Sequence, residues 1–101
     1  MELEIKMEKE GTKLTVFLNG ELTTMTAPEL KKTLEAEVPE TDTLLLDFAE
    51  CDLVSSAGLR VLLGAFKSLK AKKGQMKLLN IGENFSEVLY ITGLDAVFDC
   101  E

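Results

Sequence analysis

The sequence predicts an α/β fold with a mixed, mostly parallel sheet of four to five strands, which begins with a β-hairpin and carries three main helices. Apolar and polar residues alternate at 5–7 and 14–18, as in half-buried strands, and Glu10-Gly11 between them suits a turn. Further along, short apolar runs alternate with stretches in which apolar residues recur at helical spacing, which indicates parallel strands joined by right-handed helical crossovers. At 101 residues, the chain is expected to form a single domain over residues 1–101.

The first helix and the strand after it have clear boundary signals. Thr26 is a cap residue, Pro28 suits a first helical turn, and apolar residues then recur at helical spacing until the helix ends before Pro39. Residues 43–48 form a nearly continuous apolar run, which predicts a strand covered on both faces of the sheet.

The remaining elements alternate between helix and strand. Residues 56–73 carry one apolar face, lysines crowd its end, and Gly74 follows as the stop signal of a second helix. We expect a fourth strand at 76–79, a short helix at 85–92 and a weak final strand at 97–98. The predicted order is therefore β-β-α-β-α-β-α-β.

The composition excludes several classes of function. Eighteen acidic and eleven basic side chains give 11 − 18 = −7, a net charge that repels nucleic acid. The chain has no histidine, which removes Ser/His/Asp triads and His-containing zinc sites, and no cofactor is expected. The N-terminus lacks the features of a signal peptide and no segment is apolar enough to span a membrane, so we expect a cytoplasmic protein without membrane insertion.

Two kinds of potential metal ligand are expected to have other roles. Cys51 and Cys100 lie far apart in the chain, so we predict reduced thiols, with Cys51 buried as a small hydrophobe. Asp47, Glu50 and Asp52 cluster near the end of the buried strand and have the chemistry to hold a divalent cation. Acidic residues in such a position are usually solvated, and we predict no metal site.

Residues 52–60 are where function is expected, because they join the end of the buried strand to the start of the second helix. A serine hydroxyl at a helix start caps a backbone N–H, which explains one of Ser55 and Ser56 but not both. The small residues that follow leave N–H groups accessible, and a helix N-terminus favours negative charge, so a phosphoryl group on Ser56 would be tolerated. Arg60, one turn further on, would lie on the same face and pair with it; the alternative is an ordinary solvated arginine.

Four pieces that together span nearly the whole chain carry a family resemblance. They are Gly20-Glu21-Leu22, Leu44-Leu45-Leu46-Asp47-Phe48, Val54-Ser55-Ser56-Ala57-Gly58-Leu59-Arg60-Val61-Leu62 and Thr92-Gly93-Leu94. With these pieces the sequence resembles a STAS domain of the bacterial anti-anti-sigma factor (anti-sigma factor antagonist) type. The Ser-Ser-Ala-Gly-Leu segment is the specific part, and the others mainly confirm the register.

The resemblance implies a binding module and not an enzyme. In that family, an anti-sigma factor that is also an ATP-dependent serine kinase phosphorylates a single serine. The dephosphorylated protein sequesters this kinase and frees a sigma factor, and a PP2C-type phosphatase resets the system. By motif register the acceptor is Ser56, with Ser55 as second choice. The resemblance places these residues in the partner contact: Glu21, Thr23, Ser55, Ser56, Gly58, Leu59, Arg60, Gly93 and Leu94.

The resemblance also leaves an alternative and three departures. STAS domains also serve as accessory subunits of membrane transport complexes for lipids or anions, in which the serine is only a cap and docking residue. Thr23 and Ser55 stand where the family commonly has aspartate, and Arg60 where well-known members have a second glycine. Many members continue into a last amphipathic helix, whereas this chain stops at Glu101, which predicts a terminal face that is bare or filled by homodimerisation.

Overall fold

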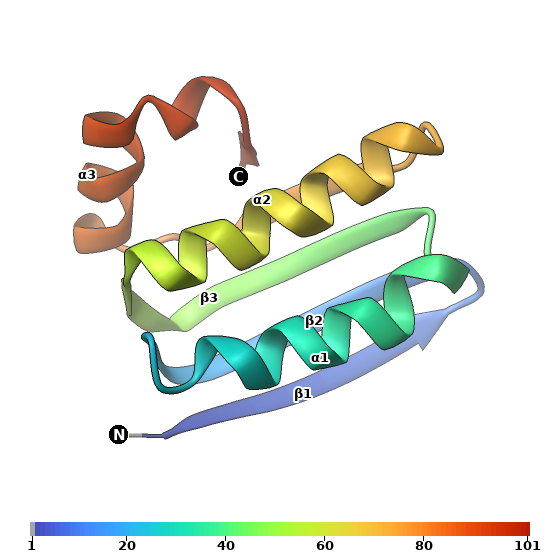
Figure 1. Cartoon of the computed structure of the whole chain (residues 1–101), viewed down its shortest axis with the longest axis horizontal. Coiled ribbons are helices and arrows are strands. Elements are labelled where there is room, and N and C mark those ends of the chain that lie inside the picture. The colour runs from blue at the N-terminus through green and yellow to red at the C-terminus, as the bar shows by residue number, and fades with distance from the viewer. Residues whose placement is uncertain (1) are drawn as a thin grey trace.

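A five-stranded mixed sheet carries the helices on one face (Figure 1). The computed structural model describes residues 2–101. The strands are β1 (Leu3–Glu10), β2 (Lys13–Leu22), β3 (Thr43–Val54), β4 (Gln75–Leu79) and β5 (Asp99–Cys100). The helices are α1 (Ala27–Glu37), α2 (Ser56–Ala71) and α3 (Glu83–Thr92), with short 3-10 turns η1 (Val38–Glu40) and η2 (Leu94–Ala96). The predicted fold class and element order are confirmed.

The helices share one face because the strands after the hairpin follow one another in a single direction. β1 and β2 are antiparallel, and each later strand lies parallel to the one before it. Right-handed crossovers that always step toward the same edge place every helix on the same face. The side chains that point to this face are buried, namely Leu14, Val16 and Leu18 of β2 and Leu44, Leu46 and Phe48 of β3.

The opposite face of the sheet has no helix over it among residues 2–101, so the prediction that residues 43–48 are covered on both faces is wrong. Thr43, Leu45 and Asp47 point to this face and are half-buried. The apolar run identified the strand correctly. It could not distinguish a sheet covered on one face from a sheet covered on both, because Leu45 is apolar in either case.

The strand predicted at 43–48 continues to Val54. β4 pairs with β3 only as far as Asp47, and beyond that point β3 pairs with the last residues of β2. Cys51 and Asp52 therefore lie within the strand and not after it. Beyond Asp47, where β3 has only one neighbouring strand, charged residues interrupt the apolar run. The apolar pattern of the sequence therefore does not show that the strand continues to Val54.

The final strand lies two residues later than predicted, at β5 and not at 97–98. The N–H of Phe98 donates to the carbonyl of Leu94 (2.9 Å), which holds residues 97–98 in a turn. The Phe98 ring packs edge-on against Phe66 of α2, with centroids 5.8 Å apart. The apolar character of this segment thus reflects packing on α2 and not strand pairing.

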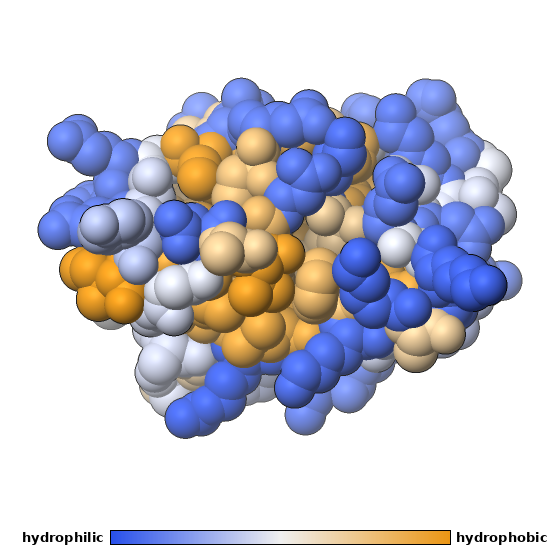
Figure 2. Space-filling model, turned by 90° about the horizontal axis from the view of Figure 1, so that it is seen from above, coloured by the Kyte–Doolittle hydropathy of each residue, from blue (hydrophilic) through white to orange (hydrophobic). Residues whose placement is uncertain are grey.

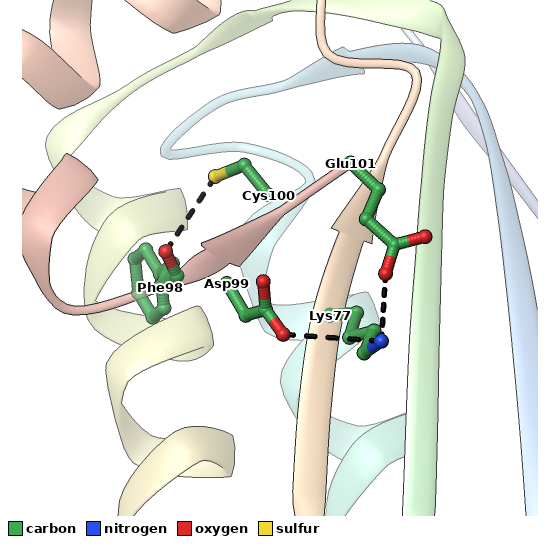
Figure 3. Close-up of polar contacts among 5 residues, drawn as sticks. All are labelled: Lys77, Phe98, Asp99, Cys100 and Glu101. Carbon is green, nitrogen blue, oxygen red and sulfur yellow. Dashed lines mark hydrogen bonds and ion pairs between the residues drawn. The ribbon is translucent and has the colours of Figure 1, made fainter.

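Lys77 of β4 adds side-chain contacts to the pairing of β4 with β5 and the C-terminal residue (Figure 3). Its Nζ donates to Glu101 Oε2 (2.6 Å) and lies 3.9 Å from Asp99 Oδ2. The hydrogen bond with the Glu101 carboxylate raises the pKa of Lys77. Because both carboxylates are largely exposed, solvent screens these ion pairs and they add little to stability.

The helix boundaries follow the prediction to within two residues. α2 ends at Ala71, two residues before the predicted end, and α3 begins two residues earlier than predicted. The left-handed backbone after α2 falls on Lys73 (φ 62°) and not on Gly74. Gly74 is required for another reason, since an added Cβ would lie 2.8 Å from the carbonyl oxygen of Asp42. Among residues 2–101, none of the helices is long and apolar enough to cross a membrane.

The side of the molecule formed by α2, α3 and the C-terminal segment is rich in apolar side chains. Figure 2 shows apolar surface gathered in the middle of this side, with hydrophilic side chains around it. Ile91 and Val97 are exposed, and Leu63, Phe66 and Leu94 are partly buried against the core. The homodimer expected from the sequence would cover apolar surface of this kind, and it stays a prediction.

The two cysteines are not joined in a disulfide within residues 2–101, and their reduced state stays a prediction. Cys51 is buried in β3, and Cys100 is half-buried in β5. Burial raises the pKa of both thiols, so the reactive thiolate is disfavoured at neutral pH.

Labelling with the thiol reagent DTNB at pH 8 should separate the two cysteines. We expect Cys100 to react about tenfold faster or more, because Cys51 is only 1% exposed and becomes accessible only when β3 opens. Reducing agent should change the melting temperature by less than about 2 °C. Cys51→Ser is the control and should remove only the slow phase. Equal rates for both thiols, or a large loss of stability on reduction, would contradict this assignment.

Candidate functional site

The candidate site lies where β2 and β3 end side by side. Parallel pairing joins Glu21 to Leu53 and Leu22 to Val54. The N–H of Ser55 then donates to the carbonyl of Leu22 (2.8 Å), which continues the strand pairing up to the start of α2. The loop after β2 and the start of α2 are therefore neighbours, although they are far apart in sequence. Together these two segments form the rim, which consists of residues 21–26 and 53–60.

Two threonines hold the rim loop between β2 and α1. Thr26 occupies the N-cap position of α1, as predicted, but its side chain does not cap the helix. Its Oγ1 donates to the carbonyl of Glu21 (2.7 Å) and accepts from the N–H of Thr23 (2.8 Å). Thr23 Oγ1 in turn accepts from the N–H of Met25 (3.2 Å). The loop is thus ordered by its own hydrogen bonds.

The two serines at the start of α2 have different surroundings. Ser55 is the N-cap, and its half-buried Oγ accepts from the N–H of Gly58 (3.4 Å). Ser56 is the first residue of the helix and is exposed. Within residues 2–101, the side-chain hydrogen bonds at this helix start involve the Ser55 hydroxyl and not that of Ser56. One hydroxyl therefore stabilises the helix, and the other is accessible.

Gly58 and Leu59 shape the rim through packing, because both are buried. A Cβ on Gly58 would lie 2.7 Å from Cγ of Leu22 and 3.1 Å from Cγ1 of Val54. The first turn of α2 therefore rests directly on the ends of β2 and β3. The prediction of an accessible backbone N–H is wrong for Gly58, because its N–H donates to Ser55 Oγ. Close packing is the reason for glycine at this position.

Two exposed apolar side chains on the rim were missed by the sequence interpretation. Met25, in the loop after β2, is 82% exposed, and Leu53, near the end of β3, is 48% exposed. Leu53 alternates with the buried Val54, which places it on the opposite side of the strand. That alternation was the available signal, but it required knowing that β3 reaches Val54. Apolar side chains exposed among polar ones are typical of protein-binding surfaces.

Asp52 holds α3 against the end of β3, so the prediction of a solvated carboxylate is wrong for this residue. The carboxylate accepts from the N–H of Phe85 (3.0 Å) and from the N–H of Asn84 (3.3 Å) in the first turn of α3. Gly82 is the N-cap of α3 and has no side chain to cap it, so Asp52 supplies the cap from β3. Negative charge at a helix N-terminus is stabilising.

Asp47 and Asp52 do not share a site. Both carboxylate oxygens of Asp47 accept from Asn80 Nδ2, at 3.2 and 3.1 Å. Along β3, Asp47 precedes Val54 by seven residues, about 20 Å at the rise of a strand, so a phosphate on Ser56 would not meet it. Within residues 2–101, no three side chains of the metal-ligating types come together.

The remaining predicted site residues lie at different distances from Ser56. Arg60 is exposed one turn along α2 and borders a cleft between α1 and α2. Gly93 and Leu94 follow the far end of the 10-residue α3, about 15 Å from its start. Gly93 ends that helix with left-handed backbone (φ 77°), and Leu94 packs against the core. The rim thus brings together Glu21, Thr23, Ser55, Ser56, Gly58, Leu59 and Arg60, but not Gly93 and Leu94.

The comparisons with known proteins identify the family. The family model for the STAS domain matches residues 4–101. The chain belongs to the STAS domain family. An anti-sigma-B factor antagonist from Listeria monocytogenes is 34% identical to this STAS domain over 98 residues, which cover 96% of this chain and 85% of the relative.

Solved structures share the STAS fold of this chain. An anti-sigma factor antagonist from Mycobacterium paratuberculosis has a TM-score of 0.87 at 24% identity, covering 98% of this chain and 85% of that chain. The Bacillus cell fate determinant SpoIIAA in its phosphorylated form has a TM-score of 0.78 at 20% identity, covering 97% and 91%. At these identities the likeness establishes the fold alone.

Removing the Asp52 carboxylate should weaken the attachment of α3. We expect Asp52→Ala to lower the free energy of unfolding by about 1 to 2 kcal/mol, because two first-turn N–H groups lose their acceptor. Glu50→Ala is the matched control, since Glu50 is an exposed carboxylate in the same strand, and it should change stability by less than about 0.5 kcal/mol. Urea denaturation measures both values. Equal losses in the two variants would show that Asp52 is not a cap.

Proposed function

We propose that this STAS domain is an anti-sigma factor antagonist, a protein-binding module that phosphorylation of Ser56 switches off. The observation that carries the proposal is that Ser56 is exposed at the first position of α2, on a rim that internal hydrogen bonds hold in place. A 34% identical relative that is named an anti-sigma-B factor antagonist supports it.

The rim has the composition of a small protein-binding surface. Met25 and Leu53 offer exposed apolar area, Glu21 and Thr23 are half-buried beside them, and Arg60 adds a cation. Interfaces of this kind combine apolar contacts with a polar surround, and arginine is common in them. We assign the contact with the anti-sigma factor to these residues together with Ser55 and Ser56.

Phosphorylation would act on binding and not on folding. A phosphoryl group on Ser56 adds about 1.5 to 2 negative charges at the positive end of α2, where the helix dipole tolerates them. Ser55 caps α2, so modification of Ser56 leaves this cap intact. A partner packed over the rim would bury that charge without a matched cation of its own, a mismatch of roughly 2 to 5 kcal/mol.

The proposed partner of the unphosphorylated form is an anti-sigma factor with ATP-dependent serine kinase activity. In this scheme the chain itself is not an enzyme: it sequesters the kinase, a sigma factor is released for transcription, and a PP2C-type phosphatase removes the phosphate. Kinase, phosphatase and sigma factor all act in the cytoplasm, where we place this chain. The alternative role in a membrane transport complex is disfavoured, because the relative that supports the family is named an antagonist.

Mass spectrometry after incubation with the cognate kinase and ATP should find one phosphate on the Ser55-Ser56 pair. We expect Ser56→Ala to abolish the modification, because Ser56 presents the accessible hydroxyl. Ser55→Ala is the control: it should remain a substrate while losing about 1 kcal/mol of stability with its cap. Phosphate that persists in Ser56→Ala would move the acceptor to Ser55.

A charged mimic at Ser56 should weaken partner binding without unfolding the domain. We expect Ser56→Asp to melt within a few degrees of the parent and to bind the kinase partner about tenfold more weakly or worse, because one buried charge reproduces part of the phosphate mismatch. Ser56→Ala should bind the partner stably. Calorimetry and a binding titration measure both properties. If Ser56→Asp binds the partner as tightly as the parent does, Ser56 is only part of the helix start and does not act as a switch.

A further inference from the structure

A cleft of about 500 Å³ opens between α1 and α2, which run side by side over the sheet (Figure 1). Leu34 and Val38 line it from the side of α1, and Val61 and Ala65 line it from α2. The volume and the lining are typical of small-molecule binding sites, whose walls are mostly apolar with a few polar groups. Neither the rim nor the proposed partner contact uses this apolar surface.

Gly64 of α2 leaves open space in the cleft, and the packing of the fold does not require a glycine at this position. It is exposed in the middle of the helix, and an added Cβ would meet no atom within 4 Å. Glycine destabilises a helix interior relative to alanine. Close packing explains the glycine at position 58 but not the glycine at position 64. The lack of a side chain at Gly64 leaves the cleft open.

The edges of the cleft carry cations although the chain is acidic overall. Lys31, Arg60 and Lys72 line it, against a net charge of −7 for the whole chain. None of the ion pairs found within residues 2–101 involves these three side chains. Lys72 Nζ donates to the carbonyl of Val38 (2.5 Å). Glu35 is the acidic residue in the lining, so the local charge is positive.

Two of these cations lie at the same end of the cleft. β2 and β3 are parallel, so α1 and α2 both begin at the rim and run in the same direction. Lys31 and Arg60 each belong to the second turn of their helix. They therefore flank the end of the cleft nearer the rim, and the apolar lining continues away from them toward Val38.

We propose that the α1–α2 cleft binds a small amphiphilic anion, with its charged head group at Lys31 and Arg60 and its apolar body along Leu34, Val61 and Ala65. A medium-chain carboxylate has this chemistry. The cationic end selects the charge of the ligand, and the space beside Gly64 admits its chain. Binding itself is independent of the proposed switch; a head group one turn from Ser56 would additionally couple ligand binding to the rim if that switch operates.

Chemical-shift titration of ¹⁵N-labelled protein tests the site with sodium decanoate as the probe. We expect saturable shifts at residues of α1 and α2 that line the cleft. Decyltrimethylammonium has the same chain length and the opposite charge, and it should bind about tenfold more weakly or worse. Sodium acetate, which has the head group alone, should produce no saturable shifts at these residues.

Two variants and one control separate the cleft from the rest of the surface. Gly64→Leu should melt at or above the parental temperature, since leucine favours helix, and should lose about tenfold or more in decanoate affinity. Arg60→Gln should weaken the binding of decanoate and should not weaken, or should slightly strengthen, the binding of decyltrimethylammonium, because it removes a positive charge. Lys70→Gln removes a cation of the same helix that lies over the Phe66 ring, outside the cleft, and should bind decanoate as the parent does.

The proposal fails if Gly64→Leu binds decanoate as tightly as the parent, or if the two decyl probes bind equally. It also fails if an acidic amphipathic peptide shifts the cleft residues while decanoate does not, because the cleft would then be a docking surface for protein. None of these measurements contains the anti-sigma partner. Their failure would leave the Ser56 switch intact, and failure of the switch would leave the cleft intact.

Discussion

The parallel pairing of β2 with the far half of β3 holds the candidate site together. β4 no longer pairs with β3 beyond Asp47, so the last residues of β3 have one neighbouring strand, β2. The Ser55 N–H adds a further bond to the carbonyl of Leu22. Gly58 lets the first turn of α2 rest on Leu22 and Val54. These contacts place Ser56 beside the end of β2.

Ser55 and Ser56 have different roles, and this difference makes a modification of Ser56 compatible with the fold. Ser55 caps α2 and is half-buried, whereas Ser56 begins the helix and is exposed. A chemical change at Ser56 therefore alters the charge of the rim and leaves the cap in place. Thr23 and Thr26 hold the facing loop in the same way, through hydrogen bonds that involve no Ser56 atom.

Net charge describes this protein poorly at the scale of its sites. The chain carries a charge of −7, yet the Asp52 carboxylate accepts hydrogen bonds at the start of α3 and the Asp47 carboxylate accepts them from Asn80. Lys31, Arg60 and Lys72 gather at one cleft. Electrostatic attraction over a few ångströms depends on such local groups, because solvent and salt screen the distant ones. A chain with a net negative charge can therefore still gather several cations at one cleft.

The sequence by itself determined the fold class, the order of the elements and the segment that holds Ser55 and Ser56. These features depend on local signals: alternation in the hairpin, helical spacing with Pro28 near its start, and small residues after a helix cap. Strand and helix periodicity are properties of neighbouring residues, so they can be read without knowing the fold.

Only the tertiary structure decided which residues meet. Asp52 caps a helix that starts 31 positions further along the chain (83 − 52 = 31), and Met25 joins Leu53 on the rim because β2 and β3 end together. The uncovered face of the sheet and the position of β5 depend on strand order and on Phe98 packing against Phe66. Such contacts form between segments distant in sequence, and no local pattern of apolar and polar residues encodes them.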